Sequence, residues 1–203
     1  MVTARSEGLR PEEALAMFLE SGALMEGHFL LSSGRHSSRY MQCARVLQYP
    51  AFASRLGEEL ARLFADSRIE AVVGPALGGI IVAQEVARAF GGRVRSLFTE
   101  REDGRMALRR GFAVAPGERV LVVEDVITTG GSAQEVIDLM RALGAVVAGV
   151  GALVDRSGGK VDFGVPLRAV VTLEIESYLP EDCPLCREGV PLVKPGSRKA
   201  GSS

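Results

Sequence analysis

The sequence lacks tryptophan, has only three cysteines, and contains no apolar stretch as long as a membrane span. An odd number of cysteines does not suggest a disulfide framework, so a reducing compartment is expected. The first ten residues are polar and lack the apolar centre of a secretory signal. We therefore expect a cytoplasmic protein with no membrane partner.

The chain also lacks an excess of charge of either sign. Its 24 lysines and arginines face 25 acids, which gives a formal net charge of -1. A nucleic-acid-binding protein usually has a clearly basic face, so we expect no nucleic-acid partner. The 203 residues are 47% hydrophobic. This length and composition predict one ordinary globular domain and exclude a disordered chain.

Apolar residues follow helical and strand patterns in alternation along the chain. Helical spacing predicts helices from Pro11 to Gly22, after Pro50, and over 80–90, and a helix that opens at Ser132 and ends near Gly144. Apolar runs predict strands at 69–73, 94–98, 120–123, 146–154 and 169–175. Ser132 and Glu135 have capping-box spacing.

Residues 99–110 show no period and are interpreted as a loop, and 194–203 are predicted to be disordered. The alternation predicts an α/β fold with a parallel sheet between layers of helices.

One segment carries most of the functional information. The bare β-branched run 120–123 leads into two acids and then into a Thr/Gly turn that opens a helix. In open parallel sheets, ligands bind at the carboxyl ends of strands. Backbone N–H groups and the helix dipole favour an anion such as a monophosphate there. The segment comprises Glu124, Asp125, Val126, Ile127, Thr128, Thr129, Gly130, Gly131 and Ser132.

The two acids would repel a phosphate, so they need another role. Carboxylates beside a phosphate site suit sugar hydroxyls, or a hydrated Mg²⁺ held mainly by substrate oxygens. The alternative is a glycine-rich turn with two solvated acids, although adjacent carboxylates that end an apolar strand are costly unless they are used. A Walker loop would need a lysine where Ala133 follows Ser132, and no G-x-G-x-x-G fingerprint occurs.

The segment 120–132 resembles the signature of the type I phosphoribosyltransferases, which has four apolar residues, two acids and a Thr/Gly phosphate loop. Residues 27–40 carry the pattern F-x-L-x-S-G-x-x-S-x-x-Y and resemble the N-terminal base-covering segment of orotate phosphoribosyltransferases. Residues 74–80 resemble their pyrophosphate loop. The resemblance spans roughly residues 20 to 175. It implies a central, mostly parallel sheet flanked by helices, within a single domain 1–203 that has a hood at about 1–45, a core at 46–180 and a C-terminal tail at 181–203.

The resemblance also implies an activity and residue roles. The 5-phosphoribosyl group would pass from 5-phosphoribosyl 1-pyrophosphate to orotate with Mg²⁺ as cofactor, giving orotidine 5′-phosphate and pyrophosphate in de novo pyrimidine biosynthesis. Glu124 and Asp125 would be catalytic and hold the ribose hydroxyls, while residues 128–132 would hold the 5′-phosphate. Thr128 and Arg156 would contact orotate, because guanidinium grips a carboxylate bidentately. The alternative for Arg156 is a surface arginine on a loop.

Two departures from the family pattern stand out. The pyrophosphate loop has Leu77-Gly78 where orotate enzymes often have a lysine, so backbone amides around Gly78 would bind the pyrophosphate. The mobile catalytic loop, supplied across a homodimer in the family, matches residues 99–110, which hold no lysine or histidine. Arg101, as a catalytic group, and Arg105 are the expected substitutes, with Arg109 or Arg110 as further candidates. A solvated charged loop is the alternative.

The remaining reactive residues receive no catalytic role. His28 and His36 lack an obvious acid–base partner and are interpreted as surface residues. Cys183 and Cys186 form a lone C-x-x-C, which is half of a zinc site unless a dimer supplies two more ligands, so we expect no bound zinc. Cys43 is assigned to packing.

Two other functions stay open. The same chemistry on a purine or uracil is the nearer one. A non-catalytic regulator that senses the phosphoribosyl donor is the other, and it would need a basic surface that the composition does not indicate.

Overall fold

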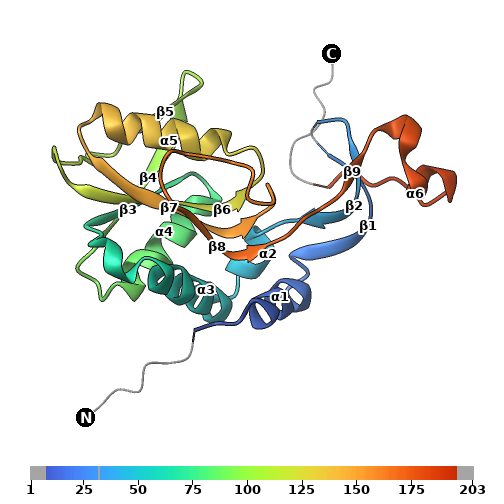
Figure 1. The fold of residues 1–203 in the computed structure, drawn as a ribbon, viewed down its shortest axis with the longest axis horizontal. Helices are drawn as coiled ribbons and strands as arrows, with labels where there is room; N and C mark the ends of the chain where they lie inside the picture. The colour runs from blue at the N-terminus through green and yellow to red at the C-terminus, as the bar shows by residue number, and fades with distance from the viewer. Residues whose placement is uncertain (1–7, 32, 196–203) are drawn as a thin grey trace, which may run out of the picture.

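The computed structural model describes residues 8–31 and 33–195, and its centre is a six-stranded sheet (Figure 1). The strand order is β5-β4-β3-β6-β7-β8, with β5 antiparallel to β4 and all other neighbours parallel. The strands are β3 (Ala71–Pro75), β4 (Arg95–Glu102), β5 (Arg105–Leu108), β6 (Arg119–Ile127), β7 (Val146–Asp155) and β8 (Leu167–Thr172). The carboxyl ends of the central strands β3, β6 and β7 therefore lie along one edge of the sheet.

Helices cover both faces of this sheet (Figure 1). α3 (Pro50–Leu63) and α4 (Gly78–Ala89) pack on one face, joined by α1 (Pro11–Glu20) and the short α2 (Ala44–Leu47), and α5 (Gly131–Ala142) packs on the other. Two apolar clusters fill the layers. One includes Leu56, Leu60, Val82 and Leu121, and the other includes Val122, Val136 and Met140. Because β6 is buried on both faces, its apolar residues are contiguous rather than alternating.

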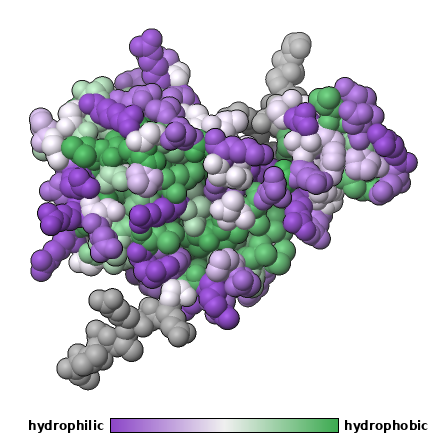
Figure 2. Space-filling model, viewed as in Figure 1, coloured by the Kyte–Doolittle hydropathy of each residue, from purple (hydrophilic) through white to green (hydrophobic). Residues whose placement is uncertain are grey.

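A second, smaller sheet stands apart from the core and forms the hood (Figure 1). It pairs β1 (Leu24–Leu30), β2 (His36–Met41) and the two-residue β9 (Ser177–Tyr178) antiparallel to one another. After β8 the chain crosses to the hood, where a 3-10 turn (Pro180–Asp182) and α6 (Pro184–Arg187) follow. The hood is therefore built from both ends of the chain. Its surface in Figure 2 is mostly hydrophilic, while hydrophobic residues gather over the core.

The helices and strands agree with most of the sequence predictions, with three differences. Residues 99–110 are not a loop, because β4 continues to Glu102 and turns into β5. This hairpin forms the edge of the sheet, where one side of each strand is exposed and no apolar pattern marks it. The capping box at Ser132 is also wrong. The N-cap of α5 is Gly130, without a side-chain cap, and Glu135 binds Arg101 instead. Lys194 and Pro195 have defined positions and are not disordered, whereas 196–203 lie outside the described residues.

Within the described ranges, no helix is both long and apolar enough to cross a bilayer.

Candidate active site at the carboxyl edge of the sheet

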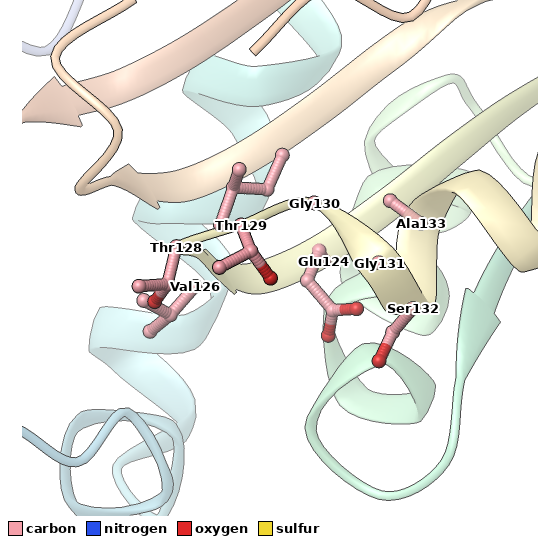
Figure 3. A pocket seen from close by; sticks show the side chains of 9 residues that line it. Glu124, Val126, Thr128, Thr129, Gly130, Gly131, Ser132 and Ala133 are labelled. Atoms are coloured by element: carbon pink, nitrogen blue, oxygen red, sulfur yellow. The ribbon is translucent and has the colours of Figure 1, made fainter. Parts of the chain in front are cut away.

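The Thr/Gly turn lies between the end of β6 and the first turn of α5 (Figure 3). Gly130 has φ +78°, and a Cβ there would lie 2.8 Å from side-chain atoms of Phe163 and Val161, so only glycine fits. The turn encloses a cavity of about 240 Å³ lined by Glu124 and by residues 126–133. The first N–H groups of α5 have no partner within the helix and are free to meet an anion in this cavity.

Polar side chains complete the wall of this cavity. Figure 3 shows the Glu124 carboxylate and the Ser132 hydroxyl on the same side of the turn, with the Thr129 hydroxyl nearby. Thr128, Thr129 and Ser132 are in the turn or the first turn of α5 and are exposed. The cavity thus combines hydroxyl donors and helix amides at one end with a carboxylate at the other.

Glu124 and Asp125 lie near the carboxyl end of β6, and both residues are half-buried. The Asp125 carboxylate accepts a hydrogen bond of 2.9 Å from the N–H of Val126, which fixes its direction. Burial, and then the charge of Asp125, raise the pKa of Glu124 to about 9. This environment disfavours the charged form of Glu124 when no ligand is bound, and a hydroxyl or cation beside it would favour that form.

The turn between β3 and α4 lies directly against this pair. A Cβ on Gly78 would lie only 2.3 Å from Asp125 Oδ2, so the backbone of the turn meets the carboxylate with no room for a side chain. A Cβ on Gly74 would lie 2.3 Å from the Gly79 carbonyl oxygen, so the two backbones approach too closely for a side chain. The turn is anchored to β4 by a bond of 2.9 Å from the Ala76 N–H to the Thr99 carbonyl oxygen. The backbone at Gly78 therefore lies directly against Asp125, although residues 74–79 are not among those that line the cavity of the Thr/Gly turn.

A second cavity, of about 560 Å³, extends from the same turn toward the hood. It shares Val126, Thr128 and Thr129 with the first cavity, so the two are adjacent. Its other lining residues come from the hood, from Asp125 and Arg156, and from the C-terminal segment: Leu30, Leu31, Ser33, Tyr40, Met41, Gln42, Cys43, Lys194 and Pro195. A ligand with two parts could place one part in each cavity.

Arg156 is held in the wall of the second cavity by the end of β7. Its backbone N–H donates to the Ile127 carbonyl oxygen at 2.7 Å. The buried carboxylate of Asp155 accepts bonds from the N–H groups of Ser157 and Gly159, which fixes the turn. Burial lowers the pKa of Arg156, and its buried Nε has no hydrogen-bond partner among the described residues. A buried cationic donor without a partner indicates that an anionic ligand belongs here.

Comparisons with known proteins agree with this geometry. The family model of the phosphoribosyl transferase domain matches residues 43–163, more than half of the chain. The orotate phosphoribosyltransferase of Pelotomaculum thermopropionicum is 61% identical over 188 residues, which are 93% of this chain and 98% of that protein. The chain belongs to the orotate phosphoribosyltransferase family.

Solved structures of orotate phosphoribosyltransferases share the fold. That from Aeropyrum pernix has a TM-score of 0.65 and 32% identity, covering 79% of this chain and 93% of its own. That from Mycobacterium tuberculosis in complex with 5-phospho-alpha-D-ribosyl 1-diphosphate has a TM-score of 0.61 and 25% identity, covering 80% and 90%. The predicted α/β fold of the type I family is therefore confirmed.

Arg101 and Arg105, the expected substitutes for the basic residues of the family's catalytic loop, lie outside both cavities. Arg101 makes two bonds of 2.9 Å to the Glu135 carboxylate on α5 and one of 2.7 Å to the Gly104 carbonyl oxygen. Arg105 is exposed at the start of β5. Neither lines either cavity in the part of the chain that the structure describes. Arg109 and Arg110 likewise pair with Glu102 and Glu100. The role of this hairpin stays a prediction.

The interpretation of His28 and His36 as surface residues is wrong. Their exposed fractions are 2% and 5%, because both rings lie between the β1–β2 hairpin and the C-terminal segment. They contact Cys183 and Cys186 there. The two histidines and the C-x-x-C motif therefore lie together within one chain. Cys43, by contrast, is a buried packing residue, as predicted, and it also lines the second cavity.

Sequence reasoning missed the contribution of the C-terminal segment to the site. Lys194 and Pro195 line the second cavity although they lie far along the chain from the hood motif and the Thr/Gly turn. Their position depends on pairing of the segment with β1, where Val193 exchanges backbone bonds of 2.8 Å with His28 and Leu30. No local pattern signals such a contact. Tyr40 and Gln42, which also line the second cavity, could have been predicted from the sequence. Tyr40 is the last residue of the hood motif, and Gln42 lies two residues after it.

Proposed function

We propose that this chain transfers the phosphoribosyl group of 5-phosphoribosyl 1-pyrophosphate to orotate, with the two adjacent cavities holding the two substrates. The observation that carries the proposal is the arrangement of three different groups around two adjacent cavities. The Thr/Gly turn lies in the first cavity, the acid pair contributes Glu124 to the first and Asp125 to the second, and Arg156, whose Nε has no partner among the described residues, lines the second. These match a 5′-phosphate, a ribose diol and the carboxylate of orotate.

The 5′-phosphate would bind in the cavity of the Thr/Gly turn. The N-terminus of α5 supplies backbone N–H donors and a partial positive charge, and Thr128, Thr129 and Ser132 add hydroxyls. Val126, Ile127, Gly130 and Gly131 would contact the group through the backbone. Glu124 and Asp125 would accept hydrogen bonds from the 2′- and 3′-hydroxyls, which orients the sugar carbon that reacts.

Orotate would bind in the second cavity, between Thr128 and the hood. Arg156 would pair with its carboxylate, and that pairing would satisfy the donor that is otherwise buried without a partner. A neutral base such as uracil or a purine would leave this donor unsatisfied. The guanidinium therefore favours orotate over the alternative bases.

Orotate phosphoribosyltransferases typically use Mg²⁺, and the donor atoms here fit it. Glu124 and Asp125 present carboxylate oxygens, the ligand type that Mg²⁺ prefers, and the ion would be held mainly by substrate oxygens with these acids facing its waters. When bound, it supplies positive charge that neutralises the leaving pyrophosphate. Gly78 and its neighbours would hold that pyrophosphate through backbone N–H groups.

The reaction requires little covalent help from the protein. Departure of pyrophosphate leaves positive charge on the ribose carbon, as in glycoside cleavage, and a ring nitrogen of orotate forms the new bond. The protein contributes position and electrostatic complementarity, while closure of the β4–β5 hairpin over the site would exclude water.

We further propose that the hairpin acts across a homodimer, with Arg101 and Arg105 reaching the partner's site. Support comes from their position outside the cavities of their own chain. Mixing inactive R101A with inactive D125N tests this. If the hairpin acts in trans, random pairing restores about one quarter of the activity, because half of the dimers carry one intact site. No recovery would place the hairpin on its own subunit.

In this proposal the whole chain works as one domain. The expected bounds, a hood at 1–45, a core at 46–180 and a C-terminal tail at 181–203, need revision, because β9 and α6 belong to the hood and α1 packs on the core. The cytoplasm is its proposed location, since all three cysteines are free thiols.

The decisive assay follows orotate absorbance after addition of 5-phosphoribosyl 1-pyrophosphate, with and without Mg²⁺. We expect a Mg²⁺-dependent loss of absorbance and formation of orotidine 5′-phosphate, with little turnover of uracil, adenine or hypoxanthine. Preferred turnover of one of those bases would favour the alternative substrate. Binding of RNA at physiological salt with no turnover of any base would favour the regulator.

A further inference from the structure

Four side chains with metal-binding atoms meet in the hood, away from the candidate active site. His28 is on β1, His36 begins β2, and Cys183 and Cys186 flank the start of α6. One ligand atom from each lies within 4.8 Å of the other three. Three of the four side chains are buried, and only Cys186 is exposed. The cluster joins residues that are about 150 positions apart in the sequence.

The distances within the cluster are those of ligands around one small ion. His28 Nε2 lies 2.9 Å from His36 Nδ1, 3.4 Å from Cys183 Sγ and 3.7 Å from Cys186 Sγ. His36 Nδ1 lies 3.3 Å from Cys186 Sγ. A tetrahedral zinc ion with two nitrogen and two sulfur ligands has ligand–ligand distances of about 3.3 to 3.8 Å. The four atoms therefore need to shift by only a few tenths of an ångström, except across the widest pair.

The hydrogen bonding of His28 favours a metal-binding tautomer. Its Nδ1 lies 2.8 Å from the Val190 carbonyl oxygen, which can only accept, so Nδ1 carries the proton. Nε2 is then unprotonated, and its lone pair faces His36 and the two thiols. Metal-bound histidines commonly donate their second N–H to a carbonyl in this way. Val190 belongs to the same turn as the cysteines, because its N–H donates to the Leu185 carbonyl oxygen.

The hood is small and has little apolar core of its own, so a metal that joins its segments would stabilise it. Its sheet has three strands, one of them only two residues long. The apolar clusters of the protein include the base of the hood, at Leu24 and Met41, but do not continue between the hairpin and α6. Units too small to bury a core are usually held by disulfides or a structural metal.

We infer that His28, His36, Cys183 and Cys186 bind one zinc ion per chain, which ties the C-terminal segment to the β1–β2 hairpin. The protein fills all four positions of the tetrahedron, so the ion has no open position for a water or substrate and is structural. Two thiolates and two imidazoles select zinc over Mg²⁺, which prefers oxygen ligands. The ion would also hold Lys194 and Pro195 in the wall of the second cavity.

The test is the metal content of the full chain, purified without an affinity tag and under reducing conditions. After equilibration with Zn²⁺ and gel filtration, elemental analysis should give one zinc per chain. Replacement by Co²⁺ should give the visible bands of a tetrahedral ion with a thiolate charge-transfer band.

C186S should lose most of the zinc, and since Cys186 is exposed the variant should still fold. C43S is the matched control, and it should keep one zinc per chain because Cys43 is remote from the cluster.

Several results would overturn the inference. They are less than one tenth of an equivalent of zinc in the reduced wild-type chain, full zinc content in a C183S/C186S double variant, and one zinc for every two chains, which would place the ligands on different subunits. A cobalt spectrum without thiolate bands would also exclude the proposed ligands. Conversely, zinc loss in C186S together with earlier proteolysis of the segment after Tyr178 would support both the site and its role in holding the hood.

Discussion

Replacing Arg156 by methionine tests whether this residue recognises the carboxylate of the base. Methionine keeps an unbranched apolar stem out to about the position of Nε but removes the charge and all donors. In the free protein the Nε of Arg156 is buried without a partner, and burial lowers its pKa. An unsatisfied buried polar group costs about 1–3 kcal/mol, so R156M should unfold at a higher temperature than the wild type.

The same substitution should weaken orotate binding. Hydrogen bonds between charged partners contribute about 1.5–3 kcal/mol, and the upper value corresponds to a factor of roughly 100 in affinity. We therefore expect the KM for orotate to rise by one to two orders of magnitude, while the KM for 5-phosphoribosyl 1-pyrophosphate changes little. R156M should therefore be more stable than the wild type and bind orotate more weakly. Replacing a residue that only supports the fold would instead lower stability.

The assay pairs initial rates with thermal unfolding of the same preparation. Binding of uracil, which lacks the carboxylate, serves as the internal control and should not weaken in R156M. An unchanged KM for orotate, or an equal loss for both bases, would refute the assignment of Arg156 as the carboxylate ligand.

Three further predictions concern the acid pair and its surroundings. D125N should keep the fold, shown by an unchanged circular dichroism spectrum, and lower turnover at least about 100-fold because a ribose contact is lost; turnover near that of the wild type would remove Asp125 from the mechanism. G78A should impair turnover, since its Cβ would lie 2.3 Å from Asp125 Oδ2, whereas alanine at Gly117, an exposed surface turn, should affect only stability. The raised pKa of Glu124, about 9, means that the ligand-free protein loses stability as pH rises from about 4.5 through 9, by at most about 1.4 kcal/mol per pH unit. E124Q should flatten that slope in urea unfolding without Mg²⁺, and identical slopes would contradict the shift.

The central part of the site could be predicted from the sequence because its signal is local. The β-branched run of β6, the two acids and the Thr/Gly turn are contiguous, and a buried parallel strand dictates that they emerge together at the sheet edge. Arg156 was predicted from the resemblance to the orotate phosphoribosyltransferases, by its position just after the neighbouring strand β7. Its lack of a partner in the free protein required the structure.

The rest depends on contacts between distant segments. The β4–β5 hairpin has an edge strand and polar, half-exposed positions, so no period separates it from a loop. The spacing of Ser132 and Glu135 predicted a helix-capping box. In the structure Glu135 instead accepts hydrogen bonds from Arg101, which lies 34 residues earlier in the chain. The C-x-x-C spacing marked two members of the hood cluster, but nothing in the local sequence connects it with His28 and His36 about 150 positions away.

A crystal structure with orotidine 5′-phosphate tests the central claim most directly, because one ligand reports on all three parts of the site. We predict its phosphate against the N–H groups at the start of α5, its ribose hydroxyls at Glu124 and Asp125, and its carboxylate on Arg156. A nucleotide bound elsewhere, or bound here with its phosphate away from the Thr/Gly turn, would contradict the account.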